Sequence, residues 1–269
     1  EMQDIESLTE IAEAAGAFVF DAFGVLNVGD CLIEGADQRL IELREQGCKI
    51  RILTNAASYD RNATIGKFDR LGLALNDGEI ITSRDAALSA LTPGNWGVIA
   101  APEDSLADIE FEHIRLEDGI EAYDLVDGFL FLSSLGWSIK KQKTLEASLQ
   151  TRARPVLVAN ADLVAPRETG FSLEPGYYGH LLLDRGLKKV RFFGKPFPEV
   201  YQLVEKSLPK FEVHKIIMCG DTLHTDIIGA TARDWRTVLV TQDGMFSGHD
   251  ALSFCHEAGI FADWRVNRI

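Results

Sequence analysis

Short, continuous runs of apolar residues alternate along the chain with stretches in which apolar residues recur every three or four positions. The runs at residues 17–20 and 49–55 have the length and composition of strands that are buried on both faces of a sheet. Periodic stretches at residues 36–46 and 62–71 predict amphipathic helices, and a glycine follows each of them. Strand, helix, strand and helix in this order predict parallel strands joined by right-handed crossovers.

The two ends of the chain share this pattern. Before the first strand, Ser7 and Glu10 have the spacing of a capping box that begins a short helix. Towards the C-terminus, the alternation predicts strands and helices at residues 190–195, 198–207, 214–221, 226–233 and 236–241. We therefore expect both ends to contribute to one core sheet.

The middle of the chain differs. A helix predicted near residues 140–150 alternates with strand-like runs at residues 96–100, 128–132 and 155–160. This predicts a second α/β domain inserted into the first, with the parts divided as residues 1–80, 81–187 and 188–269. The expected fold class is α/β: a Rossmann-like, doubly wound parallel sheet with an inserted α/β cap domain.

Composition narrows the class of partner. The chain has 269 residues, of which 46% are apolar and 25% charged, as in ordinary soluble globular proteins. Its 27 Lys and Arg against 41 Asp and Glu give a net charge of −14, which argues against nucleic acid or an anionic membrane as the main partner. A small anionic substrate stays compatible with this charge, because a local site can be positive.

The cysteines and the N-terminal segment bear on the compartment. The four cysteines form no C-x-x-C pair and no metal-ligand spacing, which favours reduced thiols over a disulfide framework. The N-terminal residues are acidic without an apolar signal core, and no apolar run is long enough to span a membrane. A cytoplasmic location is the default expectation.

Polar side chains follow four of the predicted strands. Asp21 follows the first strand, Thr54 and Asn55 follow the second, Lys195 follows a third and Asp221 a fourth. Ligands of open parallel sheets bind outside the carboxyl ends of the strands, where these residues are expected to lie. Taken singly, each has an ordinary explanation as a turn, cap or solvated residue.

The segment GDTLHTDIIGA, residues 220–230, is more specific. It places Asp221 and Asp226 around a turn directly after a buried strand. Asp226 could be a helix N-cap, but two acids at one strand end favour a compensating hard cation bound through oxygen. Together with the other strand ends, this predicts phosphoryl transfer, in which Asp21 attacks phosphorus and Mg²⁺ is bridged by Asp21 and Asp221. The Thr54 hydroxyl and Lys195 would hold the phosphate charge.

Four segments of the chain resemble the motifs of a known superfamily. In chain order, FDAFGVL, ILTNAAS, FFGKPFPEVY and CGDTLHTDIIGA resemble motifs one to four of the haloacid dehalogenase superfamily, most closely its class IIA, NagD-like phosphatase branch. LIEGA resembles that branch's flap, VANADLVAP its TN-P-D loop, and the insertion has the position and size of its C2-type cap. The resemblance covers essentially the whole chain, and motifs three and four are specific.

The resemblance implies roles for individual residues. Asp21 would be the nucleophile, Thr54 and Asn55 would bind phosphate, and Lys195 would bind phosphate and orient the nucleophile. Asp221 would bind Mg²⁺.

Two further residues of motifs one and four would complete the metal site. The backbone carbonyl of Phe23 would supply a metal ligand, and Asp226 would support the metal through its waters. The resemblance also implies a small phosphomonoester substrate, such as a sugar phosphate or nucleotide, and a homodimer formed through the cap.

Phe23 departs from the family pattern. The family's phosphatases carry at this position an Asp that protonates the leaving group and later activates water. Loss of a general acid–base group typically costs ~10²–10⁴-fold in rate. The expectation is a slow enzyme that favours good leaving groups and is limited by breakdown of its intermediate.

Residues of the insertion could replace the missing acid. Asp162, Glu174 and His180 are candidates, although each also has an ordinary role, as a turn residue, a solvated acid and a surface or packing histidine respectively. Tyr177 and Tyr178 are expected either to contact substrate or to pack beneath it.

Other interpretations stay open. The protein could bind Mg²⁺ and a phosphorylated metabolite without catalysis. It could also resemble the metal-free dehalogenases, which carry an aromatic residue at the position of Phe23, but these do not account for the paired acids Asp221 and Asp226. Carbon–phosphorus cleavage would need a cap lysine, and Lys140, Lys141 and Lys143 have the pattern of a solvated helix face.

Overall fold

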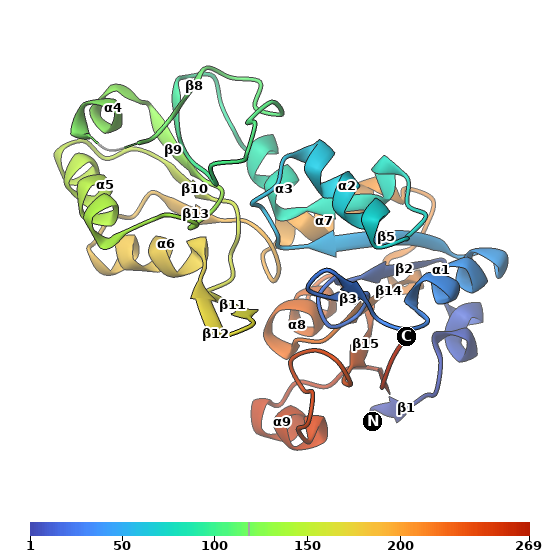
Figure 1. Ribbon diagram of the computed structural model, residues 1–269. Helices are drawn as coiled ribbons and strands as arrows, with labels where there is room; N and C mark the ends of the chain where they lie inside the picture. Colours follow the sequence, from blue (N-terminus) through green and yellow to red (C-terminus); the bar gives the residue numbers. More distant parts are fainter. Residues whose placement is uncertain (118) are drawn as a thin grey trace. The chain divides into compact units, whose positions relative to one another are not determined.

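The structure is a computed structural model that describes residues 1–117 and 119–269. The chain forms two compact units, each taken by itself below (Figure 1). The core unit comprises residues 1–54, 65–81 and 195–269. The inserted unit comprises residues 55–64 and 82–194.

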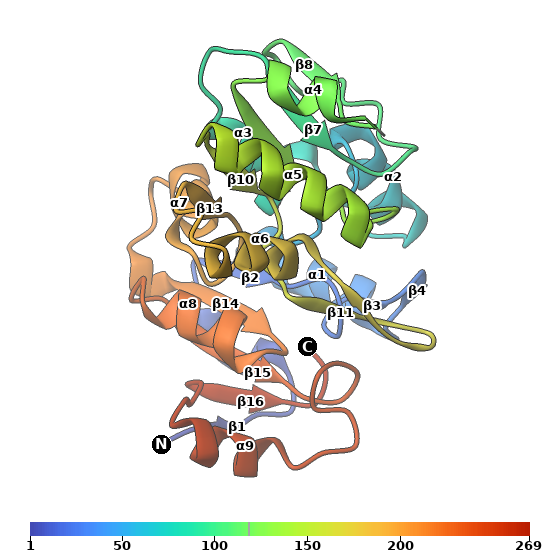
Figure 2. The same cartoon turned by 90° about the vertical axis from the view of Figure 1, so that its left-hand side faces the viewer.

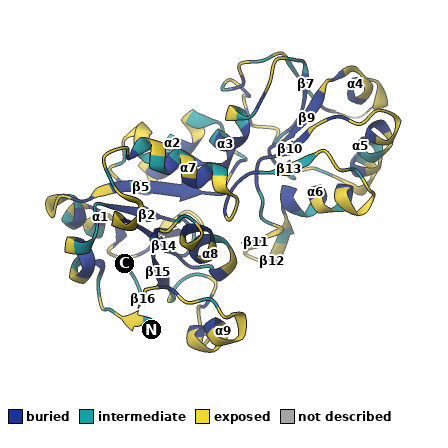
Figure 3. Cartoon of the chain, turned by 180° about the vertical axis from the view of Figure 1, so that it is seen from behind, coloured by how far each residue is buried: buried dark blue, intermediate teal, exposed yellow. Residues whose placement is uncertain are grey.

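A parallel sheet organises the core unit and confirms the predicted α/β class. Among the described residues it has seven strands, in the order β1 (Gln3–Asp4), β16 (Trp264–Val266), β15 (Arg236–Val240), β14 (Ile216–Gly220), β2 (Ala17–Phe20), β5 (Lys49–Thr54) and β6 (Ile80–Thr82). Both ends of the chain supply its central strands, as the sequence predicts. All residues of β2 and β14 are buried, which explains their continuous apolar runs (Figure 3).

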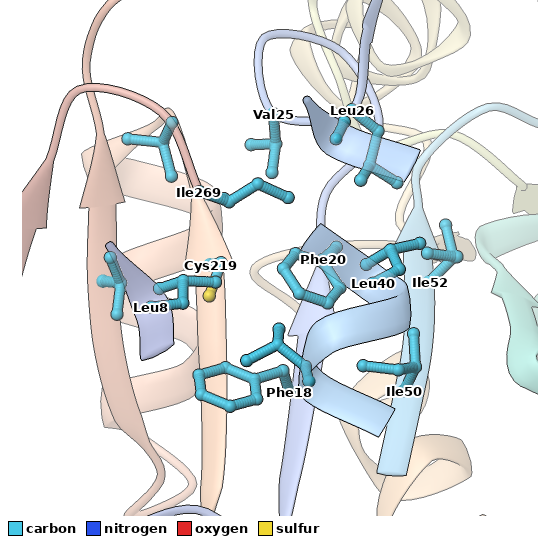
Figure 4. Packing of buried hydrophobic residues seen from close by; sticks show 14 of the residues in the cluster. Leu8, Phe18, Phe20, Val25, Leu26, Leu40, Ile50, Ile52, Cys219 and Ile269 are labelled. Carbon is cyan, nitrogen blue, oxygen red and sulfur yellow. The ribbon is translucent and has the colours of Figure 1, made fainter. Parts of the chain in front are cut away.

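Helices cover both faces of this sheet. The chain elements involved are the 3₁₀ helix η1 (Leu8–Ala14), α1 (Ala36–Glu45), α2 (Arg61–Arg70), α7 (Pro198–Ser207), the π-helix η4 (Leu223–Ile227), α8 (Ile228–Thr231) and α9 (Ala251–Ala258). Leu8 of η1 and Leu40 of α1 pack with Phe18 and Phe20 of β2 in one apolar cluster (Figure 4). The predicted capping box of Ser7 and Glu10 is present and begins η1.

The inserted unit has its own parallel sheet. Its described strands run in the order β13 (Val190–Phe192), β10 (Val156–Val158), β9 (Gly128–Phe131), β7 (Trp96–Ile99) and β8 (His113–Arg115). Helices α4 (Ile120–Leu125), α5 (Ile139–Thr151) and α6 (Pro175–Asp184) pack on it through one apolar cluster, with α5 and α6 visible over the sheet in Figure 2.

Shorter elements complete the two units. The inserted unit also contains α3 (Ser83–Ser89) and the hairpin of β11 (Val164–Arg167) and β12 (Gly170–Leu173). The core unit also contains the hairpin of β3 (Asn27–Val28) and β4 (Cys31–Leu32) and the short 3₁₀ helices η2 (Asp77–Glu79) and η3 (Val213–Lys215).

One strand assignment from the sequence was wrong. Residues 190–192 were expected in the core sheet, but β13 pairs in parallel with β10 of the inserted unit, with Val156 opposite Val190. Val190 and Phe192 flank the exposed Arg191, and this local pattern indicates a strand but not its partner, so its sheet depends on long-range packing. The inserted unit accordingly ends at Gly194, whereas the sequence pattern placed its end at residue 187.

Two expectations about the chain as a whole can be compared with the structure. All four cysteines carry unpaired thiols, and Cys48, Cys219 and Cys255 are buried. Across the described residues, the helices are too short or too polar for any of them to cross a bilayer.

Candidate active site

The candidate site lies at the carboxyl ends of neighbouring strands of the core sheet. Strand β2 pairs with β14 on one side, with Phe20 opposite Cys219, and with β5 on the other, with Phe20 opposite Ile52. Asp21 follows β2, and its backbone N–H donates to the carbonyl of Cys219 at 3.0 Å. Parallel pairing in this register brings Asp21 and Asp221 to adjacent positions at one edge.

Lys195 joins two of the acids. Its Nζ lies 2.9 Å from Oδ1 of Asp21 and 2.7 Å from Oδ1 of Asp226. The lysine is 3% exposed. Burial alone would lower the pKa of Lys195, but the negative charges of Asp21 and Asp226 outweigh burial and raise it above the ordinary value. Lys195 is therefore a fixed positive charge beside Asp21.

Asp226 organises the turn after β14. Its Oδ1 accepts from Lys195, and its Oδ2 accepts from the backbone N–H of Asp221 at 3.1 Å and from the Thr222 hydroxyl at 2.9 Å. The Asp226 side chain packs directly on Gly220, where any Cβ would overlap its carboxylate. Gly220 is thus required by close approach, and Asp226 is committed to protein donors through both oxygens.

Asp221 is held from the other side. The backbone N–H of Met245 donates to its Oδ2 at 2.9 Å. A Cβ on Gly24 would lie 2.7 Å from the same oxygen, so the backbone next to Phe23 runs against this carboxylate. Gly244 also packs on Asp221. Only glycines allow these loops to approach so closely.

The three acids form a cluster suited to a cation. One carboxylate oxygen from each of Asp21, Asp221 and Asp226 can be chosen so that all lie within 4.8 Å of one another. When ionised, they and Lys195 carry a formal charge of −2, from three negative charges and one positive. Burial, followed by mutual repulsion, raises the pKa of each carboxyl to about 6. This donor set fits a hard divalent ion such as Mg²⁺.

Three further residues were expected in the site: Thr54, Phe23 and Asn55. Thr54 is the last residue of β5 and is buried. Phe23 is half-buried, in the loop between Asp21 and β3. Asn55 follows Thr54 but belongs to the inserted unit, where its amide Nδ2 donates to Asp162 at 2.9 Å.

Sequence reasoning missed several residues of the site. Thr222 and Gly24 were parts of recognised motifs without a role in the site, and Gly244 and Met245 were not considered. A Gly–Met pair just beyond the predicted strand at residues 236–241 was an available signal, because loops after parallel strands meet at one edge.

The candidate replacements for the missing acid lie in the inserted unit. Asp162 accepts from Asn55, and the buried Glu174 accepts from Arg167 and Ser172. His180 is exposed and stacks on Phe192.

The two tyrosines of the inserted unit pack together. Tyr178 is buried and stacks on Phe131, and Tyr177 lies edge-on to it. The two tyrosines therefore contribute to packing within the inserted unit.

Lys140 and Lys143 of α5 are exposed, in agreement with the predicted solvated helix face.

Family comparison agrees with this architecture. The family described as haloacid dehalogenase-like hydrolase matches residues 18–105, and the family described as HAD-hydrolase-like matches residues 192–263. Together these matches contain all seven residues expected in the site. The chain belongs to the haloacid dehalogenase-like hydrolases.

Relatives of this chain are named as phosphatases. Phosphoglycolate phosphatase 1A of Arabidopsis thaliana is 31% identical over 137 residues, which are 48% of this chain and 38% of that protein. The match thus spans well under half the length of the plant enzyme. Phospholysine phosphohistidine inorganic pyrophosphate phosphatase of Homo sapiens is 24% identical over 249 residues, 90% of this chain and 85% of that protein.

Solved structures share the fold of this chain. A protein of Cytophaga hutchinsonii described as a possible sugar phosphatase superposes with a TM-score of 0.86 and 24% identity, covering 100% of this chain and 98% of that one. NagD of Escherichia coli superposes with a TM-score of 0.75 and 17% identity, covering 95% and 97%. A glycerol phosphate phosphatase of Mycobacterium tuberculosis, solved with magnesium, superposes with a TM-score of 0.71 and 21% identity, covering 91% of this chain and 71% of that one.

The acid cluster predicts how the stability of the protein responds to Mg²⁺ and pH. A folded-state pKa near 6, above the ordinary 3.8, means that the folded protein binds protons more tightly than the unfolded chain. The metal-free protein should therefore lose stability as pH rises from about 4 through 6. Mg²⁺ should offset this loss, so it should raise Tm more at about pH 8 than at about pH 5.

Thermal unfolding with and without Mg²⁺ at the two pH values measures this effect. Asp221→Asn should abolish the increase in Tm caused by Mg²⁺. The matched control is Asp69→Asn, which changes an exposed residue of α2 and should keep that increase. An equal Mg²⁺ response in wild type and Asp221→Asn would contradict the assignment of the cluster.

Proposed function

We propose that this protein is a Mg²⁺-dependent phosphatase that hydrolyses a small phosphomonoester through an aspartyl-phosphate on Asp21. One observation carries the proposal: a buried Lys195 holds Asp21 at 2.9 Å beside two further carboxylates at a strand edge. The relatives named as phosphatases support the reaction class. Sugar phosphates, nucleotides and similar metabolites are the candidate substrates.

The metal site can be proposed from the hydrogen bonds of the acids. Asp21 and Asp221 would bind Mg²⁺ directly, with the backbone carbonyl of Phe23 as a further ligand. Asp226 already uses both oxygens for protein donors and would act on the metal through its waters. When bound, Mg²⁺ would reduce the repulsion between the Asp21 carboxylate and the phosphate.

In the first step, a carboxylate oxygen of Asp21 attacks phosphorus, and the bond from phosphorus to the leaving oxygen breaks. Lys195, Thr54 and Asn55 would hold the phosphate oxygens through their ammonium, hydroxyl and amide groups. The leaving oxygen departs with the electron pair. Phe23 offers no proton, so a leaving group that is stable as an anion is favoured.

In the second step, water attacks phosphorus, the bond from phosphorus to Asp21 breaks, and the carboxylate is regenerated with release of phosphate. The water must lose a proton, and Phe23 cannot accept it. This step should therefore limit turnover, and the aspartyl-phosphate should accumulate.

The test is the time course of p-nitrophenol release from p-nitrophenyl phosphate with Mg²⁺ at high enzyme concentration. We expect a burst approaching one equivalent of enzyme, followed by slow turnover. Asp21→Asn should lower the rate by ~10⁴-fold or more and remove the burst, as loss of a nucleophile does. Asp69→Asn, which changes an exposed Asp, should leave both unchanged.

Other outcomes would replace the proposal. Release that is indifferent to Asp21→Asn would place the activity elsewhere or in a contaminant. Absence of release together with tight, Mg²⁺-dependent phosphate binding would make the protein a metabolite-binding protein with the fold of a hydrolase.

A further inference from the structure

We propose that Asp162 is a positioning residue that fixes the orientation of the Asn55 amide. The two residues are 107 positions apart in sequence, and both belong to the inserted unit. The inference deepens the proposed function and rests on it where it assigns Asn55 to phosphate. The bond itself is independent of that function.

The environment of Asn55 restricts its side chain. Nδ2 donates to Oδ1 of Asp162 at 2.9 Å, and the backbone carbonyl of Asn55 accepts from the buried Ser83 hydroxyl at 2.9 Å. A Cβ on Gly194 would lie 2.6 Å from Oδ1 of Asn55, so the chain before Lys195 packs closely on the amide oxygen. The amide is thus bounded at both its nitrogen and its oxygen end.

Carboxylate chemistry decides which way the amide faces. An ionised carboxylate only accepts hydrogen bonds, whereas an amide has a donor end and an acceptor end. Turning the Asn55 amide over would set its oxygen against the oxygen of Asp162. Asp162 therefore selects one orientation of the amide dipole at the residue that directly follows Thr54.

The Asp162 loop is itself held in place. Oδ1 of Asn160 accepts from the backbone N–H of Asp162 at 2.9 Å, and the Ala161 N–H donates to Phe193 at 3.0 Å. Gly176, in the first turn of α6, packs on the loop so closely that a Cβ would lie 2.5 Å from the Asp162 carbonyl oxygen. Such anchoring is what a positioning residue needs, because a mobile carboxylate could not orient a partner.

This arrangement separates Asp162 from the role of a replacement acid. Asp162→Asn keeps an acceptor oxygen for Asn55 but cannot exchange a proton, whereas Asp162→Ala removes both. Positioning predicts that Asp162→Asn stays within about threefold of wild-type kcat/KM, while Asp162→Ala falls by about tenfold, the usual scale for losing a charge-assisted bond. Equal losses in both variants would overturn positioning in favour of charge or proton transfer.

A double-mutant cycle tests whether Asp162 acts through Asn55. If it does, Asp162→Ala should have no further effect on kcat/KM in the Asn55→Ala background. Additive losses would overturn the inference. Asp184→Ala, at an exposed position of α6, is the matched control and should leave kcat/KM unchanged.

A readout without turnover keeps the inference distinct from the proposed function. In ¹H–¹⁵N spectra of the full chain, the side-chain NH₂ signals of Asn55, assigned by their loss in Asn55→Ala, should shift in Asp162→Ala and hold closer to wild type in Asp162→Asn. Unshifted signals would overturn the inference even in an active enzyme. Shifted signals in a protein without turnover would support the positioning bond and count only against the proposed function.

Discussion

Phe23→Asp should raise the steady-state turnover of alkyl phosphomonoesters by ~10²–10⁴-fold, the range associated with a general acid–base group. The wild-type chain has no titratable side chain at this position. Phe23 is half-buried in a loop, so an Asp can be accommodated without opening the apolar core. The new carboxyl group would protonate the leaving oxygen and then accept a proton from the attacking water.

Leaving groups distinguish the two steps in this variant. An alkyl phosphate needs protonation of its leaving oxygen, whereas p-nitrophenolate does not, so the gain in the first step should be larger for alkyl substrates. Both substrates share breakdown of the aspartyl-phosphate, so the burst with p-nitrophenyl phosphate should merge into steady turnover.

Phe23→Asn is the control for this gain, because it matches Asp in size but does not exchange a proton. It should turn over no faster than wild type. An equal gain in Phe23→Asn and Phe23→Asp would mean that bulk, not the missing acid, limits the enzyme. Absence of gain in Phe23→Asp would mean that another group already supplies the proton transfer.

Lys195→Met should have the largest effect on stability. Removing one partner of a buried ion pair leaves the other charge uncompensated and typically costs ~3–5 kcal/mol. Lys195 bonds Asp21 at 2.9 Å and Asp226 at 2.7 Å, and Asp226 is fully buried. Turnover should also be lost, because Asp21 loses the charge that orients it.

The loss of stability in Lys195→Met should depend on pH. Burial and repulsion already raise the pKa of Asp21 and Asp226 to about 6 with Lys195 present, and the values should rise further without it. The deficit relative to wild type accrues where the carboxyl groups are ionised in wild type but harder to ionise in the variant, so it should be small at about pH 5 and largest at about pH 8.

Urea unfolding in metal-free buffer at about pH 8 and at about pH 5 measures this deficit. Lys206→Met changes an exposed lysine of α7 and should alter the free energy of unfolding little at either pH. A deficit in Lys195→Met that is the same at both pH values would show that lost packing, rather than uncompensated charge, is responsible.

The position of the acids at the sheet edge could be predicted from sequence. The runs before Asp21 and Asp221 are apolar throughout, because β2 and β14 are buried on both faces at the centre of a parallel sheet. Polar residues directly after such strands must lie at their carboxyl ends. The motifs around them were specific enough to indicate the family, which the family comparison confirms.

The sheet of a short strand could not be predicted in this way. Val190 and Phe192 alternate with the exposed Arg191, a pattern that suits a strand in either sheet, and β13 pairs with β10. The side-chain pattern indicates how far a strand is buried, and both sheets contain strands that are exposed or only partly buried, such as β1 in one and β8 and β13 in the other. The choice between them depends on which backbone lies alongside, which the local sequence does not contain.

The sequence by itself determined the α/β class, the family and the strand ends that carry Asp21, Thr54 and Asp221. Only the tertiary structure decided which hydrogen-bond donors each carboxylate meets. The two oxygens of Asp226 accept from Lys195 and from the turn after β14, and Asp162 accepts from the Asn55 amide. The physical reason is range. Apolar periodicity records how each segment is buried, whereas a hydrogen bond between residues 31 or 107 positions apart exists only once the sheets have assembled.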